Sequence, residues 1–182
     1  DGIIGVSQGV LSNIRHHRKE VIYNGKEIYS GKTHVAQDLL LQWRLPAERK
    51  LCLAAGRLVE VKGFDTLIRS WQQIDDCLVI LGEGPEQAAL EKLARDIRVH
   101  DRVRLVGYRT DVEALLPAAD LVVISSRREG FNYVMAEALM AKVPLVSTRV
   151  AGPDEILPAQ YLCDVDSPGA LAKVIRSALA AP

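Results

Sequence analysis

From residue 51 to the end of the chain, short apolar runs alternate with amphipathic stretches. The apolar runs are predicted to be strands, at residues 51–55, 77–81, 103–106, 121–124, 144–147 and 161–163. They do not alternate between apolar and polar residues, and this is typical of strands buried on both faces of a parallel sheet. The stretches between them are predicted to be helices, at residues 64–74, 86–97, 111–116, 132–141, 153–157 and 168–180. In the second of these, Leu90, Leu93, Ala94 and Ile97 recur at helical spacing and form one apolar face.

Strands that alternate with helices predict an α/β fold with a doubly wound, parallel, Rossmann-like sheet of six strands. The commonest order for such strands is 3-2-1-4-5-6, which places the carboxyl ends of the first and fourth strands side by side. Ligands bind in the crevice at this switch point. The segments that follow residues 55 and 124 are therefore the first places to look for a binding site.

The first 50 residues follow a different pattern. Residues 2–6 and 21–23 are predicted to be strands, with a helix near residues 8–17 between them. Asn24-Gly25 is a turn signal, and residues 26–50 are predicted to form a loop and a helix at 35–43. Trp43 and Trp71 fall at apolar positions of predicted helices, so we expect both to serve packing.

Composition narrows the class of protein. The 182 residues suit one domain, or one domain with an appendage. Lys plus Arg and Asp plus Glu number 23 each, and this balance argues against a broad surface for nucleic acid or anionic lipid. Cys52, Cys77 and Cys163 contain no C-x-x-C pair, so we expect buried free thiols rather than a zinc or redox site. We see no secretory signal, and we expect a cytoplasmic location.

Charged residues gather at the predicted switch point. Arg57 and Lys62 follow the first strand, and Lys62 lies near the start of a helix. Glu129-Gly130 follows the fourth strand and opens the helix at 132–141. Free N–H groups at a helix start bind anions. The two segments therefore predict a clamp for a phosphate or diphosphate that needs no metal, because Arg and Lys supply the countercharge.

Two glutamates extend this prediction. Tyr133 and Glu137 share one helical face, so Glu137 lies about one turn below the anion, where a carboxylate can accept hydrogen bonds from ribose hydroxyls. Glu129 would face the other side of the diphosphate, where a transferable group would lie. An arbitrary pair of glutamates is more often solvated on a helix surface, but the position after the fourth strand favours function.

Several motifs in register resemble a known family. They are Gly56-Arg57-Leu58, Lys62-Gly63-Phe64, Gly82-Glu83-Gly84-Pro85, Gly107-Tyr108, Glu129-Gly130-Phe131 and Glu137. Together they resemble the large family of retaining glycosyltransferases with the GT-B fold (glycosyl transferases group 1, family 4), whose paired glutamates also have seven residues between them. Residues 151–156 resemble the motif that follows. The similarity covers 51–157 and reaches back to 5–7 and 21–25, which look like the last strands of the family's N-terminal domain and the hinge.

The resemblance implies a role for each matched residue. Arg57 and Lys62 would bind the donor diphosphate, and Glu137 would bind the ribose. Glu129 would contact the donor sugar and stabilise positive charge at its anomeric carbon. Backbone N–H groups would reach sugar hydroxyls and phosphate from Gly130, Phe131, Asn132, Tyr133 and Val134. Tyr108 and Arg109 would hold the base, largely through their backbone.

The resemblance also implies how the chain is organised. Residues 1–25 would be a remnant of the N-terminal acceptor domain and hinge, and residues 26–182 the C-terminal nucleotide-sugar-binding domain. The intact enzyme would transfer a sugar, with retention, from a nucleotide-diphosphate sugar to an acceptor in lipopolysaccharide, polysaccharide or other glycan synthesis. It would need no cofactor and would lie in the cytoplasm, with peripheral contact at the inner face of the membrane as an alternative. Without the rest of the N-terminal domain, this chain alone is expected to be inactive.

Some features depart from this pattern or admit other interpretations. Asn132 stands where many relatives carry Pro, and Ala151 replaces a frequent Gly. Gly82-Glu83-Gly84 lacks the third glycine of a dinucleotide fingerprint, so a simple turn explains it equally well. The basic cluster at 15–19 is expected to be a solvated helix end rather than a membrane or acceptor contact. A non-catalytic nucleotide-binding module and another GT-B enzyme, such as a sugar-nucleotide epimerase, remain alternatives.

Overall fold

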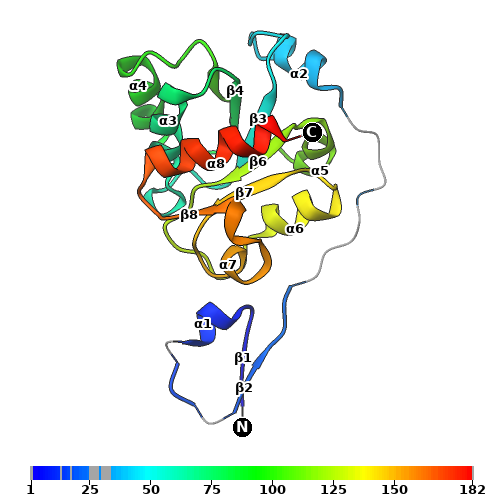
Figure 1. Ribbon diagram of the computed structural model, residues 1–182, viewed down its shortest axis with the longest axis vertical. Coiled ribbons are helices and arrows are strands. Elements are labelled where there is room, and N and C mark those ends of the chain that lie inside the picture. The colour runs from blue at the N-terminus through cyan, green and yellow to red at the C-terminus, as the bar shows by residue number, and fades with distance from the viewer. Residues whose placement is uncertain (1, 13, 17, 25–28, 30–33, 182) are drawn as a thin grey trace.

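The computed structural model describes residues 2–181 except 13, 17, 25–28 and 30–33. This part of the chain forms an α/β domain and a smaller N-terminal lobe (Figure 1). Gly25, the second residue of the expected turn, lies outside the described residues.

The six-stranded sheet has the predicted topology. Its strands are β3 (Leu51–Ala55), β4 (Cys77–Leu81), β5 (Val103–Leu105), β6 (Leu121–Ile124), β7 (Leu145–Thr148) and β8 (Leu162–Cys163). They lie in the order β5-β4-β3-β6-β7-β8, and every neighbouring pair is parallel. This is the order 3-2-1-4-5-6, so the expected topology is confirmed. The switch point lies between β3 and β6, where Cys52 pairs with Leu121.

Helices cover both faces of the sheet (Figure 1). One core contains side chains from α3 (Phe64–Ser70), α4 (Gln87–Asp96) and α8 (Pro168–Ala180). The other contains side chains from α2 (Ala36–Gln42), α5 (Val112–Leu115) and α6 (Tyr133–Met140). Alternate residues of β3 enter the two cores, since Cys52 and Ala54 belong to the first and Leu51 and Leu53 to the second. Burial on both faces explains why the strands contain almost no polar residues.

Some helices end earlier than the apolar pattern predicts. The helix expected at 64–74 ends as α3 at Ser70 and continues as a 3₁₀ turn, η2 (Trp71–Gln73). Trp71 is fully buried there, and its Nε1 donates to the carbonyl of Asp76 at 2.7 Å. The helix expected at 111–116 is divided into α5 and the 3₁₀ turn η3 (Leu116–Ala118). Trp43 is also buried, and so are the three free cysteines, as the sequence predicts.

The N-terminal lobe consists of β1 (Ile3–Gly5), α1 (Gln8–Ser12) and β2 (Lys19–Val21), with the two strands parallel. β2 begins two residues earlier than the strand expected at 21–23, because the ladder pairs Ile3 with Lys19. The helix expected at 8–17 is also shorter, since the N–H of Ile14 closes a turn on the carbonyl of Leu11 at 3.1 Å. In Figure 1 α1 lies next to α7 (Pro153–Ile156), so the lobe meets the larger domain there.

Candidate functional site

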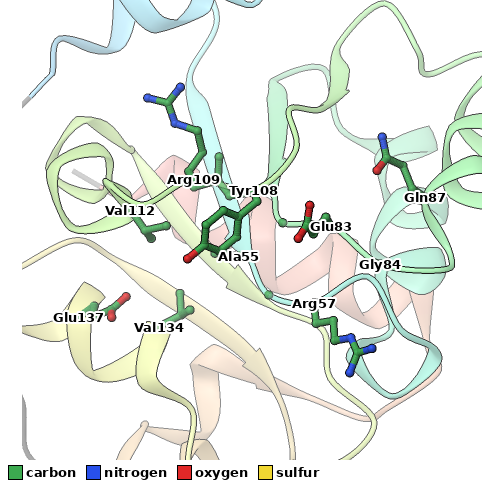
Figure 2. A pocket seen from close by; sticks show the side chains of 13 residues that line it. Ala55, Arg57, Glu83, Gly84, Gln87, Tyr108, Arg109, Val112, Val134 and Glu137 are labelled. Carbon is green, nitrogen blue, oxygen red and sulfur yellow. The ribbon is translucent and has the colours of Figure 1, made fainter.

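A cavity of about 770 Å³ opens beside the carboxyl ends of β3 and β4, close to the switch point. Its walls come from the loops after these strands, from the segment after β5 and from α6. The lining residues are Ala55, Gly56, Arg57, Leu81, Gly82, Glu83, Gly84, Gln87, Tyr108, Arg109, Val112, Val134 and Glu137. In the view of Figure 2, Glu137 and Val134 lie on one side of the cavity and Arg57, Gly84 and Gln87 on the other.

The loop after β3 brings the two predicted cations. Arg57 lines the cavity with an exposed side chain, and its guanidinium makes no hydrogen bond or ion pair with the described residues. Lys62 ends the 3₁₀ turn η1 (Glu60–Lys62), directly before α3. Its Cε lies 3.6 Å from the position that a Cβ on Gly56 would occupy, so its stem passes the edge of the cavity. The ammonium group is therefore close to the site without lining the cavity itself.

Glu129 is the centre of a polar cluster formed with Lys62, Ser126 and Asn132, which we call the Glu129 cluster. Its Oε1 accepts hydrogen bonds from Lys62 Nζ at 2.6 Å and Ser126 Oγ at 2.6 Å. Asn132 Nδ2 donates to the same oxygen at 2.9 Å. The side chain of Glu129 is only 8% exposed, yet the described residues give Oε2 no hydrogen bond. One carboxylate oxygen is thus fixed, and the other can accept a bond from a ligand hydroxyl.

The start of α6 leaves backbone donors open. Asn132 is the N-cap, and its Oδ1 accepts from the N–H of Met135 at 3.0 Å, which satisfies one of the donors that a helix start leaves free. The N–H groups of Tyr133 and Val134 have no backbone or side-chain acceptor among the described residues. Asn132 therefore serves the helix and the Glu129 cluster at once, with its amide oxygen on the helix start and its nitrogen on Glu129.

The loops after β3 and β6 are joined by hydrogen bonds to backbone carbonyls of the first loop. Ser125 Oγ donates to the carbonyl of Lys62 at 2.9 Å, and the N–H of Arg127 donates to the carbonyl of Val61 at 2.8 Å. Gly63 adopts a left-handed conformation with φ of 64°, and a Cβ there would overlap the carbonyl oxygen of Ser125. The close approach of the two loops thus requires glycine at position 63, and it fixes Lys62 relative to the start of α6.

Arg127 strengthens the same junction from its outer side. Its guanidinium donates to Asp65 at 2.9 Å, to Asp166 at 2.6 Å and to the carbonyl of Glu60. Burial is the largest single influence on the pKa of Asp65 and works to raise it, but the hydrogen bond and charge of Arg127, together with backbone N–H groups, outweigh it and the pKa is lowered. Both carboxylates raise the pKa of Arg127. This arginine follows the predicted switch point in sequence, but it holds the loops together and is not among the residues that line the cavity.

The predicted ribose and base residues lie around the cavity. Glu137 lines it from α6, one turn below the open helix start, as the sequence predicts. Tyr108 is 65% exposed and lies at its wall. The Arg109 side chain is directed to Asp111, with hydrogen bonds at 2.8 and 2.6 Å, and these bonds lower the pKa of the Asp111 carboxyl. The predicted role of Arg109, which is to hold the base through its backbone, is compatible with this side-chain ion pair.

The structure brings the sequence-predicted residues into two adjoining groups. Arg57, Tyr108, Arg109, Val134 and Glu137 line the cavity. Lys62, Glu129 and Asn132 form the Glu129 cluster, while Phe131 and Tyr133 pack against each other with ring centroids 5.7 Å apart. Gly130 lies between Glu129 and Phe131 in the sequence, and it does not line the cavity.

Sequence reasoning missed several residues of the site. Ser126 was not singled out, although a serine at the carboxyl end of a central parallel strand is a signal that could have found it. Gly82, Glu83 and Gly84 belong to the motifs that carry the resemblance, and a simple turn explains them equally well in the sequence, so no site role is predicted for them; all three line the cavity. A Cβ on Gly82 would overlap the carbonyl oxygen of Gly56, so this glycine allows the loops after β3 and β4 to approach each other. Gln87, on α4, gave no signal in the sequence.

Two further observations concern metal binding and membrane-spanning helices. In the part of the chain that the structure describes, no group of three or more His, Cys, Asp or Glu side chains is placed to bind a metal ion. Among the described helices, none combines the length and apolar character needed to cross a membrane.

Comparison with known sequences connects the site to a family. The family model for glycosyl transferases group 1 matches residues 49–181. A lipopolysaccharide core biosynthesis glycosyltransferase, LpsE of Rhizobium meliloti, is 40% identical over 109 residues, which are 59% of this chain and 32% of the relative. N-acetyl-alpha-D-glucosaminyl L-malate synthase of Bacillus anthracis is 28% identical over 147 residues, covering 76% of this chain and 39% of the relative. The chain thus spans about a third of the length of such curated relatives.

Solved structures match nearly the whole chain. Anabaena Alr3699/HepE, in complex with UDP and glucose, superposes with a TM-score of 0.87 at 25% identity, over 98% of this chain and 53% of HepE. WaaG, a glycosyltransferase involved in lipopolysaccharide biosynthesis, gives a TM-score of 0.81 at 21% identity over 98% of this chain and 53% of WaaG. These matches confirm the expected α/β fold of half a GT-B protein. Since the family model covers most of the sequence, the chain belongs to the glycosyl transferases of group 1.

Proposed function

We propose that this chain is the donor-binding half of a retaining glycosyltransferase. The observation that supports it most is the Glu129 cluster beside the open start of α6, at the edge where β3 and β6 are neighbours. A cation, a half-satisfied carboxylate and free helix N–H groups meet there next to a 770 Å³ cavity. Residues 26–182 would be the nucleotide-sugar-binding domain, and residues 1–25 the end of the preceding acceptor domain and the hinge.

The donor diphosphate would lie between the loop after β3 and the start of α6. Arg57 has no competing partner among the described residues, so it can bind a phosphate without breaking an existing contact. Lys62 would add a second cation, and the N–H groups of Tyr133 and Val134 would donate from the positive end of the helix dipole. Two cations and a helix start supply enough countercharge for the clamp to work without a metal ion.

The nucleoside would extend into the cavity. Glu137 would accept hydrogen bonds from the ribose hydroxyls, and the backbone at Tyr108 and Arg109 would hold the base. Alr3699/HepE was solved with UDP and with UDP-glucose, so a uridine nucleotide is the first donor to test. The volume of the cavity suits a nucleoside, since binding pockets of about 300–1,000 Å³ are usual for small ligands.

The sugar would then lie against Glu129. In the reaction, the bond from the anomeric carbon to the departing phosphate oxygen breaks, and a bond to the acceptor hydroxyl oxygen forms with the same configuration. The proton of that hydroxyl passes to the departing phosphate oxygen. Oε2 of Glu129 would accept from the sugar and stabilise positive charge at the anomeric carbon, while Arg57, Lys62 and α6 stabilise the leaving nucleoside diphosphate. The lipopolysaccharide core enzymes among the relatives suggest an acceptor in cell-envelope glycan synthesis.

The direct test is nucleotide binding by the 182-residue chain. Calorimetry with UDP, GDP and ADP in EDTA is expected to show weak binding of at least one nucleoside diphosphate, because half of an interdomain cleft is absent. Arg57→Met is expected to weaken that binding, whereas Arg95→Met, on the exposed side of α4, serves as the control. Absence of binding by all three nucleotides at millimolar concentration would exclude the proposal.

A further inference from the structure

Glu155, on α7, joins two parts of the chain that are far apart in sequence. Its Oε2 accepts from the N–H of Gln8 and from the hydroxyl of Tyr23, each at 2.9 Å. Its Oε1 accepts from the N–H of Gly9 at 2.9 Å and from the N–H of Gly152 at 3.4 Å. We call this set of hydrogen bonds the clasp. One carboxylate thus holds the N-terminal lobe against the segment after β7, where α1 and α7 lie side by side in Figure 1.

The electrostatics of the clasp favour the ionised carboxylate. Partial burial works to raise the pKa of Glu155, but the N–H groups of Gly9 and Gln8 and the Tyr23 hydroxyl outweigh it, and the pKa is lowered. The hydrogen bond to Glu155 in turn raises the pKa of Tyr23. Both groups therefore keep the protonation states that the clasp requires at neutral pH.

Tyr23 links the clasp to the candidate donor site. Its ring contacts Phe131 with centroids 6.4 Å apart and an interplanar angle of 48°. Phe131 in turn meets the edge of Tyr133 at 5.7 Å and 81°. Tyr133 is the first residue of α6 and carries one of the open N–H groups. A continuous series of contacts therefore runs from Glu155 through Tyr23 and Phe131 to the start of α6.

A second contact lies beside this series. The side chains of Val10 and Val6 lie 3.5 and 3.8 Å from the position that a Cβ on Gly130 would occupy. The lobe therefore packs against the loop between β6 and α6 at Gly130 as well as at Phe131. Movement of the lobe would change the surroundings of the loop that carries Glu129.

We propose that Tyr23 and Glu155 are positioning residues for donor binding. The clasp holds Tyr23 against Phe131 and so keeps the loop between β6 and α6 in the geometry that receives the donor. This inference rests on the proposed donor-binding function. A positioning role can be distinguished from a purely structural contact, because energetic coupling between the clasp and the nucleotide site must act in both directions. If the clasp strengthens nucleotide binding, nucleotide binding must strengthen the clasp by a comparable factor.

The experiment measures both directions of the coupling on the 182-residue chain, with UDP as the probe. Calorimetry gives the UDP affinity of the parent, Tyr23→Phe, Glu155→Gln and the control Asp154→Asn, whose carboxylate is also on α7 but pairs with Arg149 at 3.0 Å. Tyr23→Phe keeps the ring on Phe131 and removes only the hydroxyl. Amide hydrogen exchange at Gln8 and Gly9, with and without saturating UDP, reports the stability of the clasp.

We expect Tyr23→Phe and Glu155→Gln to weaken UDP binding by roughly fivefold, the lower end of typical coupling factors, and Asp154→Asn to leave it unchanged. In the parent, UDP is expected to slow exchange at Gln8 and Gly9 by a similar factor. Equal UDP affinity in all four proteins, or exchange that UDP does not alter, would overturn the inference and leave the proposed function standing. A parent that binds UDP, GDP and ADP not at all would overturn both.

Discussion

Replacing Glu129 by glutamine removes a negative charge that lies 2.6 Å from the ammonium of Lys62. In the free protein this carboxylate neutralises the cation that we assign to the donor diphosphate. If one ammonium bridges Glu129 and a phosphate oxygen, the two negative groups lie at most about 5.5 Å apart, for hydrogen bonds of about 2.8 Å. Their repulsion is then about 0.8 kcal/mol in a water-like medium and about 3 kcal/mol at an effective dielectric constant of 20.

These values give the expected changes in affinity. Because Lys62 is only 26% exposed and Glu129 only 8%, the water-like value is a lower bound, and Glu129→Gln is expected to tighten nucleoside diphosphate binding by at least about threefold. Lys62→Met removes a charge-assisted hydrogen bond of roughly 1.5–3 kcal/mol, so it is expected to weaken binding by roughly ten- to a hundredfold. In the intact enzyme, Glu129→Gln is expected to lower kcat, because charge at the anomeric carbon is no longer stabilised.

Calorimetry at low and physiological salt checks the binding of the variants. Glu86→Gln, at the N-cap of α4 and outside the cavity, is the matched control for loss of one carboxylate. If Glu129→Gln weakened nucleoside diphosphate binding tenfold, the carboxylate would be a diphosphate-supporting group rather than a sugar ligand. If Lys62→Met bound as tightly as the parent, Lys62 would not contact the diphosphate.

Three further predictions follow from the geometry of other residues. Glu137→Ala is expected to weaken nucleoside diphosphate binding by roughly ten- to a hundredfold through loss of the ribose hydrogen bonds, and unchanged affinity in calorimetry would exclude that role. Gly63→Ala is expected to lower the free energy of unfolding by at least about 1 kcal/mol, because alanine disfavours the left-handed conformation, and Gly169→Ala within α8 is the control in denaturant titrations. The pKa of Glu155 is lowered from the ordinary glutamate value of 4.5, so the clasp is complete above pH 4.5 and is lost as pH falls through the lowered pKa. The NMR chemical shift of the Gly9 amide is therefore expected to titrate below pH 4.5 in the parent and not in Glu155→Gln.

The sequence predicts the sheet well because its strands are buried on both faces. The strands at 51–55, 77–81 and 121–124 have the predicted bounds, since a continuous apolar run ends where burial ends. The strand expected at 21–23 is displaced to Lys19–Val21, because its position depends on pairing with β1 rather than on its own side chains. Half-exposed strands in a small lobe carry too weak an apolar pattern to fix their register.

The position of the candidate site could be predicted from the sequence, but the hydrogen bonds within it could not. Topology directs attention to the loops after β3 and β6 and so predicts Arg57, Lys62 and Glu129, and helical spacing adds Glu137. The hydrogen bonds among side chains could not be predicted, because they depend on the path of each loop. No sequence pattern shows that Asn132 caps α6 with its oxygen and binds Glu129 with its nitrogen.

The arrangement of the two loops suggests how the proposed clamp would hold a diphosphate without a metal ion. An electrostatic clamp is effective when its charges are held in place before the ligand arrives, because no free energy is then used to reorient them. Here the backbone of the Lys62 turn is tied to the β6–α6 loop through Ser125 Oγ and through the N–H of Arg127, and Gly63 permits the close approach. The distance from Lys62 to the start of α6 is therefore set by backbone groups and the short side chain of Ser125 rather than by long, flexible side chains. A diphosphate would meet donors that already converge, and the Lys62 ammonium, which has three N–H donors, would bridge Glu129 and a phosphate oxygen.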